Sequence, residues 1–477
     1  MKRTLLLLAV TFGAIAAAPQ TQQEIASAEH GRAFSPALAA ALDGDPAVAA
    51  RAALAIGRTL DPAGAPVLRA HVGATDPAVR AMVIYGLGLL TDRTAIPVIT
   101  TLGRGDTNSA VRYAAADALG RIAAAAPAQT TQLASTLLAM ARGDRDVVVR
   151  AHAAANLDPF RTTTVAQHVA FALQSAFRHE SDRDVRWHEM WTLARAYAKL
   201  SSPAFFKGAL ADPDDTVRLL AVKAIGRQGD RNAIPVVRPL LDDPSWRVQE
   251  EATEALRVLD GKPLTEHLAA LQPGLHLPPV KTLPEDAVAP LPRPPATGKP
   301  KAPSLDDVLF TPSIYPTSAK LMNGPMPGPH PRVRVTTTQG TFVLRLYPEW
   351  APFTVANFLN LANAGYFDGN RWFRVVPDFV VQTGDQTNTG DGDPGFTIGA
   401  EENPVEQRSG IISMGLDYKN DKPVRDSAGS QFYLTLSPQL HLDRSFTVFG
   451  EVQSGFDVLP RIVENDKMVR VEQISNG

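Results

Sequence analysis

The stretch DPAVRAMVIYGLG, residues 76–88, has a near copy in DPDDTVRLLAVKAIG, residues 212–226. A second pair, DRTAIPVI at 92–99 and DRNAIPVV at 230–237, follows the first. The valine of the repeated V-R element recurs at steps of 31, 32, 38, 36, 32 and 31 residues, at Val48, Val79, Val111, Val149, Val185, Val217 and Val248. Such a period indicates stacked supersecondary units.

Each repeat unit is expected to contain two helices. Asp-Pro offers an N-cap followed by a proline at the first helical position, where a missing N–H costs nothing. Apolar residues then recur at helical spacing, as in Val79, Val83, Leu87 and Leu90. Neither helix can bury its stripe alone, so we expect the units of residues 29–272 to stack into an all-α solenoid.

The rhythm D-P-x-V-R-x-x-A-x-x-A-L-G over about residues 35–260 resembles HEAT-like repeats of the short type first noted in phycobilin lyases. In that family the arginine after the valine usually bonds an aspartate of an adjacent turn. The resemblance therefore implies a structural ladder at Arg80, Arg112, Arg150, Arg186 and Arg218. Repeats of this kind define a fold and not an activity, so a lyase function has only fold-level support.

A less regular stretch, residues 156–200, interrupts the repeats and is richer in aromatic residues and histidine. Two interpretations stay open for its large side chains. They line a groove for a protein partner, or they fill a wider core, and the residues concerned are Trp187, His188, Trp191 and Tyr197.

The N-terminus has the pattern of a secretory signal. Lys2 and Arg3 precede an apolar run from Leu5 to Ala18, which is too short to span a bilayer. We expect residues 1–28 to be a signal peptide that is cleaved after Ala18 or Ala28, with an uncleaved membrane anchor as the alternative. The expected location is the periplasm or another extracytoplasmic space of a bacterium, with no membrane span after signal removal.

Composition excludes several classes of function. The 477 residues carry a formal net charge of −2, which gives no electrostatic footprint for nucleic acid. The absence of cysteine excludes disulfides, thiolate zinc sites, iron–sulfur clusters and cysteine nucleophiles. No metal site and no cofactor is expected.

Residues 273–330 form a proline-rich segment, in which 15 of 58 residues are proline. This composition favours extended polyproline II geometry. We expect a linker that holds two domains apart, so that each folds alone. Ser304 to Asp307 is the exception, because its sequence predicts a short capped helix that docks on a neighbour.

The C-terminal residues 331–477 alternate short apolar strands with Gly, Asp and Pro loops. Alternating strands at 333–338 and 342–347 are joined by Gln339 and Gly340, and a helical pattern follows at 352–366. Many short strands and two helices predict a closed antiparallel β-barrel.

Four segments of this region resemble the cyclophilins, the peptidyl-prolyl cis–trans isomerases, and the bacterial type in particular. They are GTFVLRLYPEWAPFTVANFLNLANAGYFDG, WFRVVPDFVVQTGD, GSQFYLTL and HLDRSFTVFGEV. The resemblance implies that Arg374, Phe379 and Gln382 are catalytic. It implies substrate contacts at Val380, Gly390, Gly415, Leu416, Gln431, Tyr433, His441, Leu442 and Phe446.

The chain departs from the family pattern at several of these positions. Phe373 replaces the histidine before the arginine, and Val380 replaces the usual methionine. Gly415 and Leu416 stand where Ala-Asn or Ala-Arg is common, at the site that grips the residue before proline. His441 replaces the tryptophan of eukaryotic members.

The residue types also suit the reaction itself. Rotation about a peptide bond has a barrier of about 18–20 kcal/mol, and a catalyst must bind the twisted amide better than the planar forms. An apolar cup can hold the proline ring while Arg374 donates to the substrate carbonyl and the prolyl nitrogen. Gln382 can orient Arg374 or bind the substrate backbone.

Two hypotheses on function follow. The first is an exported peptidyl-prolyl isomerase, a folding helper that acts on proline-containing clients and uses its solenoid to bind clients or a protein partner. The second is a scaffold that binds proline peptides with little or no turnover. The intact arginine, phenylalanine and glutamine favour the enzyme, and the departures from the pattern keep the scaffold open.

Overall fold

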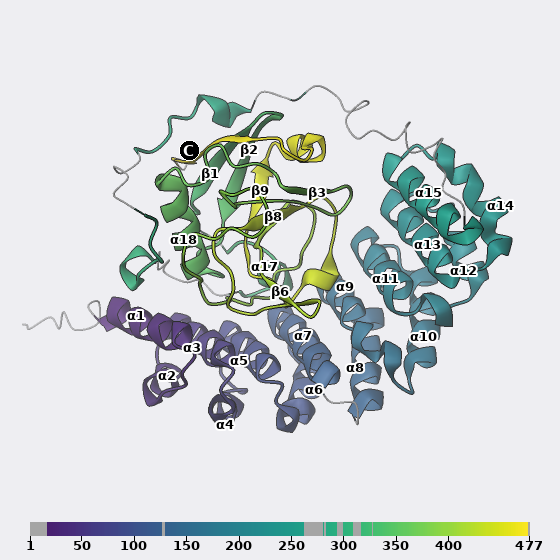
Figure 1. Cartoon of the computed structure of the whole chain (residues 1–477). Helices are drawn as coiled ribbons and strands as arrows, with labels where there is room; N and C mark the ends of the chain where they lie inside the picture. Colours follow the sequence, from purple (N-terminus) through teal and green to yellow (C-terminus); the bar gives the residue numbers. More distant parts are fainter. Residues whose placement is uncertain are drawn as a thin grey trace, which may run out of the picture.

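The computed structural model describes residues 17–125, 129–261, 280, 283–292, 299–308, 316–326 and 328–475. Residues 1–16 of the predicted signal and much of the predicted linker lie outside these ranges. In the described part, a helical arc holds a strand-rich body on its concave side (Figure 1). The predicted combination of an α-solenoid with an antiparallel barrel is confirmed.

The helices of the arc form two layers (Figure 1). The inner layer faces the barrel and consists of α1 (Ala17–His30), α3 (Pro46–Thr59), α5 (Pro77–Leu89), α7 (Ser109–Ala125), α9 (Val147–Ala155), α11 (Arg183–Ala196), α13 (Asp215–Gln228) and α15 (Trp246–Asp260). The outer layer consists of α2 (Pro36–Ala41), α4 (Ala65–Ala70), α6 (Ile96–Gly105), α8 (Thr130–Gly143), α10 (Ala166–His179), α12 (Pro203–Ala209) and α14 (Ile234–Val237).

Small residues set the spacing of the inner layer. A Cβ atom on Gly57 of α3 would lie 2.6 Å from the Cα of Gly86 in α5. A Cβ on Gly88 would lie 2.7 Å from the Cα of Ala118 in α7. Both distances are shorter than real contacts allow, so these glycines let neighbouring helix backbones approach closely.

Aspartates cap several of the inner helices, although not always at the predicted position. Asp45 and Asp76 precede a proline and accept hydrogen bonds from the first turns of α3 and α5, as the Asp-Pro pattern predicts. In α13 the cap is Asp214 instead of Asp212, so the helix begins two residues later than the pattern indicates.

The predicted arginine ladder is confirmed. Each arginine reaches a carboxylate of the next repeat, which ties adjacent units together through charge-assisted hydrogen bonds. The acceptor in the third pair is a glutamate. The pairs are Arg80–Asp106, Arg112–Asp144, Arg150–Glu180, Arg186–Asp212 and Arg218–Asp243.

The C-terminal body is built on one eight-stranded antiparallel sheet in the order β10-β1-β2-β9-β5-β8-β4-β3. Its strands are β1 (Arg332–Thr337), β2 (Gly340–Leu346), β3 (Arg374–Val376), β4 (Val380–Thr383), β5 (Ile411–Met414), β8 (Phe432–Thr435), β9 (Val448–Ser454) and β10 (Met468–Ile474). A small hairpin of β6 (Tyr418–Lys419) and β7 (Lys422–Pro423) lies apart from it. The sheet curls, and a bridge between Arg371 and Lys467 joins its two edges.

Helix α18 (Pro352–Asn363) contributes to the barrel core, where Phe358 contacts Phe367, Phe432 and Phe449. Sequence analysis predicted two helices in this domain. Among the described residues of the barrel, the other helical segments are short 3-10 turns, and the longest spans Phe456–Arg461. It contains Pro460, which lacks the N–H needed to continue an α-helix.

The expectation that the proline-rich segment holds the domains apart is wrong for its described residues. Leu291 donates its N–H to Gln473 at the edge of β10, at 2.8 Å. Residues 304–308 dock between α1 and α18, where Val308 contacts Ala26 and Phe353, so the capped turn predicted at Ser304 is confirmed. Further on, the short helix α17 (Ala319–Met322) packs on α7.

The position of helix α1 favours one of the two predicted cleavage sites of the signal peptide. The boundary at residue 28 falls inside this helix, whose Ile25 and Ala26 are buried. Of the two predicted cleavage sites, only the one after Ala18 leaves both residues in the chain. No helix among the described residues combines the length and the apolar character needed to cross a membrane.

The barrel meets the solenoid mainly through the segment 400–408, which we call the docking loop. The guanidinium of Arg58 in α3 is fully buried and donates to the carbonyl oxygens of Glu402 and Trp350, both at 2.7 Å. Tyr113 of α7 donates its hydroxyl to the Pro404 carbonyl at 2.9 Å. The two domains are therefore in intimate contact, contrary to the expectation that few contacts would join them.

Glu406 is the charged centre of the docking loop. Its carboxylate is 2.8 Å from Nδ1 of His152 in α9 and 3.4 Å from Nε2 of His188 in α11. Asn323 of the linker and Arg408 of the barrel also bind it, at 2.7 Å and 3.1 Å. Burial alone would raise the pKa of Glu406, but Arg408 and the two histidines outweigh it and hold this pKa well below its usual range.

Replacing Glu406 by glutamine should destabilise the whole chain. The change keeps the shape of the side chain but removes the buried negative charge that binds Arg408 and the two histidines, and removing one partner of a buried ion pair typically costs about 3–5 kcal/mol. Thermal and urea unfolding of the full chain measure the effect. Glu464→Gln is the control, because Glu464 is exposed and should change stability by less than about 0.5 kcal/mol. Equal shifts in the two variants would contradict this role of Glu406.

Candidate active site

Three neighbouring strands place the predicted polar residues in one row. Arg374 of β3 lies opposite Gln382 of β4, and Gln382 lies opposite Tyr433 of β8. Residues directly opposite one another in an antiparallel sheet project from the same face. The alternate residues Val381 and Phe432 belong to the barrel core, so the row lies on the outer face of the barrel.

A chain of hydrogen bonds fixes the arginine. Arg374 donates from Nη1 to Oε1 of Gln382 at 3.3 Å, and Gln382 donates from Nε2 to Oε1 of Gln431 at 3.2 Å. Gln431 in turn donates to the carbonyl oxygens of Gly390 and Gly392, at 2.8 Å and 3.1 Å. The backbone of the loop that contains Gly390 and Gly392 thus determines, through the two glutamines, the orientation of the exposed guanidinium of Arg374.

Apolar side chains form a cup beside the row. Val380, Tyr433, Leu442 and Phe446 are buried together, and Phe379 and Leu416 pack against them while staying partly open. The rings of Tyr433 and Phe446 meet edge to face, with centroids 5.6 Å apart. A compact apolar ring such as that of proline suits this lining.

Phe379, at the edge of the cup, contacts both Arg374 and His441. The guanidinium carbon of Arg374 lies 5.4 Å from the centre of the Phe379 ring, within the range of a cation–π contact. His441 stacks on the same ring, with centroids 5.7 Å apart and 16° between the planes. All the predicted site residues therefore lie in or beside one continuous surface.

Two departures from the family pattern have a packing reason. A Cβ atom on Gly390, whose φ is +90°, would contact the Phe373 ring at 3.3 Å, so the phenylalanine and the glycine fit each other. A Cβ on Gly415 would lie 3.0 Å from the Cβ of Gln431 and 3.3 Å from Nε2 of Gln382. Gly415 thus leaves room for the two glutamines.

This arrangement can assist rotation about a peptide bond without a nucleophile. The cup would hold the proline ring, and Arg374 would present its donors where the substrate carbonyl and the prolyl nitrogen lie. Because the arginine is already oriented, it does not have to reorganise when the amide twists. Among the described residues, no group of three or more histidine and carboxylate side chains could hold a metal ion.

The sequence did not predict that helices of the solenoid lie beside the active site. Burial and the nearby cations Arg195, Lys223 and Arg227 lower the pKa of His441 to about 4. These cations belong to α11 and α13, which therefore lie beside the rim of the cup. The aromatic stretch around Trp191 was the available signal, but sequence alone could not distinguish a groove from a core. In the structure Trp187, His188, Trp191 and Tyr197 are all buried, which agrees with the interpretation as a wider core. Trp187 and Trp191 also line a cleft against the barrel, and a role of that cleft in binding a partner stays a prediction.

A barrel with this row and cup defines a prolyl isomerase domain, and comparisons with known proteins agree. The family described as cyclophilin type peptidyl-prolyl cis-trans isomerase matches residues 332–475. HEAT repeats match residues 34–120, 73–158 and 202–289.

Individual proteins show the same likeness. Peptidyl-prolyl cis-trans isomerase B of Bacillus subtilis is 46% identical over 131 residues, which are 27% of this chain and 87% of that protein. Peptidyl-prolyl cis-trans isomerase-like 1 of Neurospora crassa is 41% identical over 140 residues, or 28% of this chain and 83% of that protein. A crystal structure of a Cryptosporidium parvum cyclophilin type peptidyl-prolyl cis-trans isomerase has 27% identity and a TM-score of 0.29, and covers 31% of this chain and 100% of that one.

The chain belongs to the cyclophilin-type peptidyl-prolyl cis-trans isomerases, with HEAT repeats in its N-terminal region. The structure brings the predicted site residues together, and their individual roles in catalysis remain predictions.

Replacing Arg374 by alanine should abolish most isomerase activity while the chain stays folded, because the side chain is exposed. A preorganised donor of this kind is typically worth about 10²–10³ in rate. Arg374→Lys should recover little, since a point charge cannot replace a planar fork. The measurement is cis-to-trans exchange of an Ala-Pro peptide by NMR, with a thermal melt of each variant.

Arg371→Ala is the matched control, because Arg371 is another exposed arginine three residues earlier and outside the cup. It should keep both exchange rate and melting temperature. Wild-type exchange in Arg374→Ala with an unchanged melt would overturn the role assigned to Arg374.

Proposed function

We propose that this protein is an exported folding helper that isomerises X–Pro bonds in client polypeptides and uses part of its solenoid to bind them. The observation that carries the proposal is the continuity between the cup and the solenoid. Phe379 and His441 form the edge of the cup and also line a cleft against α11, α13 and α15. A client held at the cup would therefore touch both domains.

Most of the inner face of the solenoid is already occupied by the chain itself. Helices α3, α7, α9 and α11 bind the docking loop through Arg58, Tyr113, His152 and His188. The region that remains for clients is consequently the end formed by α11, α13 and α15. Clients would therefore bind at this end of the solenoid and not along the whole repeat region.

The competing hypothesis, a proline-binding scaffold with little turnover, rests on Phe373, Gly415 and Leu416. The geometry at Phe373 and Gly415 favours the enzyme. Phe373 packs on Gly390, and Gly415 gives space to Gln382 and Gln431, so both departures are compatible with an oriented Arg374. Neither departure removes a donor from the row.

Refolding of a denatured protein whose slow phase is proline isomerisation tests this function. The full chain should accelerate the slow phase, because uncatalysed exchange takes tens to hundreds of seconds. Arg374→Ala should lose the acceleration, and Arg371→Ala should keep it. If the wild-type chain binds proline peptides but leaves the slow phase unchanged, the scaffold hypothesis replaces the enzyme.

Export is the remaining part of the proposal, and it rests on the basic and apolar pattern of residues 2–18. Mass spectrometry of the protein recovered from the periplasmic fraction of a bacterial host should give a chain that begins at Pro19. This site preserves the buried residues of α1. Recovery of the intact chain from the cytoplasm alone would contradict export.

A further inference from the structure

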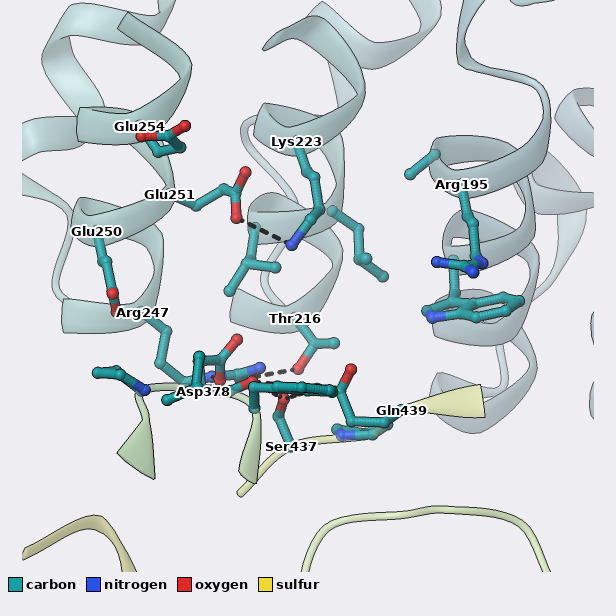
Figure 2. A pocket seen from close by; sticks show the side chains of 18 of the residues that line it. Arg195, Thr216, Lys223, Arg247, Glu250, Glu251, Glu254, Asp378, Ser437 and Gln439 are labelled. Carbon is teal, nitrogen blue, oxygen red and sulfur yellow. Dashed lines mark hydrogen bonds and ion pairs between the residues drawn. The ribbon is translucent and has the colours of Figure 1, made fainter. Parts of the chain in front are cut away.

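The cleft beside the active site has walls from both domains. Its volume is about 550 Å³, and it lies between α11, α13 and α15 of the solenoid and the barrel segments 376–379 and 437–441. Figure 2 shows these helices above the barrel loops, with their side chains directed into the space between them. Because Phe379 and His441 belong to both surfaces, the cleft continues the proline cup.

Charges of both signs line the cleft, and most of its acidic groups belong to α15. Glu250, Glu251 and Glu254 project from α15 on one side, and Arg195 projects from α11 on the other (Figure 2). Glu251 pairs with Lys223 at 3.2 Å, and Glu254 pairs with Arg257 on the same helix. The acidic wall therefore has cations of its own.

Two cations of the cleft, Arg195 and Arg227, differ from the others. Within the described part of the chain, neither forms an ion pair with a carboxylate. Arg227 donates to the Ala194 carbonyl at 2.8 Å, whereas the guanidinium of Arg195 lies over the Trp191 ring at 5.6 Å from the centre. Arg195, Lys223 and Arg227 act together on His441, and burial and these cations lower the pKa of that histidine. The part of the cleft beside His441 is therefore a pocket that combines guanidinium groups without an ion pair and the aromatic rings of Trp191 and Phe379.

The site residues indicate which part of a bound client would lie in this pocket. The family resemblance assigns the residue before proline to Gly415 and Leu416, and neither lines the cleft. In a bound client, the residues that follow the proline would therefore lie in the cleft. The carboxylate of an aspartate or glutamate there would meet Arg195.

We propose that this cleft is a specificity site for clients with acidic residues just after the isomerised proline, and that Arg195 binds the carboxylates of these residues. The inference rests on the proposed function, because it assigns the cleft to the substrate of the same active site. Charge complementarity and continuity with the cup support it. The solenoid would thus select among X–Pro bonds that the barrel alone treats alike.

Three peptides test the proposal on the full chain. They are acetyl-Ala-Ala-Pro-Ala-Glu-Glu-Ala-amide, the same peptide with Gln-Gln in place of Glu-Glu, and acetyl-Glu-Glu-Ala-Pro-Ala-Ala-Ala-amide. NMR exchange gives kcat/KM for each peptide, and titration followed by tryptophan fluorescence gives its affinity. The first peptide should be preferred over the second by about five- to tenfold at low salt. At 1 M salt the preference should approach one, because the Debye length falls to about 3 Å.

Arg195→Gln should bring the preference for the acidic peptide close to one. The matched control is Arg178→Gln on α10, since Arg178 is also exposed and lies over an aromatic ring, 5.5 Å from the centre of Phe205, but does not line the cleft. The control should keep the preference. A thermal melt of each variant verifies that both are folded.

The outcomes distinguish a failure of the specificity site from a failure of the proposed function. Equal kcat/KM and affinity for the first two peptides in the wild-type chain, or a preference that survives Arg195→Gln, would overturn the specificity site. An equal preference for the third peptide would overturn its placement after the proline. If no peptide is isomerised, the proposed function fails, and the affinities still decide whether the cleft selects acidic segments.

Discussion

The buried carboxylate of Glu406 is the point on which the arrangement of the molecule depends. Histidines of α9 and α11, an asparagine of the linker and an arginine of the barrel all bind it. A buried charge without partners is costly, so only a geometry that supplies all of them is stable. One side chain therefore links the three parts of the chain, and the docking loop around it fixes the barrel against the solenoid.

This constraint explains why the solenoid does not behave as an independent module. In a repeat protein each unit contacts its neighbours, and the concave face usually stays available. Here the docking loop follows that face from α3 to α11, where Arg58 and Tyr113 bind backbone carbonyl oxygens and His152 and His188 bind Glu406. The cleft beside Phe379 lies where this occupation ends, so the interface that joins the domains also shapes the surroundings of the active site.

The sequence predicted what is periodic or local. The V-R repeat located the solenoid and its arginine ladder, and the segments that resemble cyclophilins located the row and the cup. It could not predict the interface, because the residues that meet there, such as His188 and Glu406, are 218 positions apart and leave no local pattern. The linker was misjudged because its proline content describes the stiffness of a free chain. Composition does not show that an edge strand such as β10 pairs with Leu291.

The contact of α1 with α18 has a consequence for biosynthesis. Ala26 and Phe353 lie in one apolar cluster, and His30 stacks on the Phe353 ring at 4.8 Å. A ribosome adds about 5–20 residues per second, so more than 300 further residues must be made, over tens of seconds, before this first helix meets its partner. The early repeats must therefore wait with an incomplete inner face until the last domain has emerged. A chain with this requirement is suited to delayed folding, in which the whole polypeptide is available before any part of it reaches its final packing.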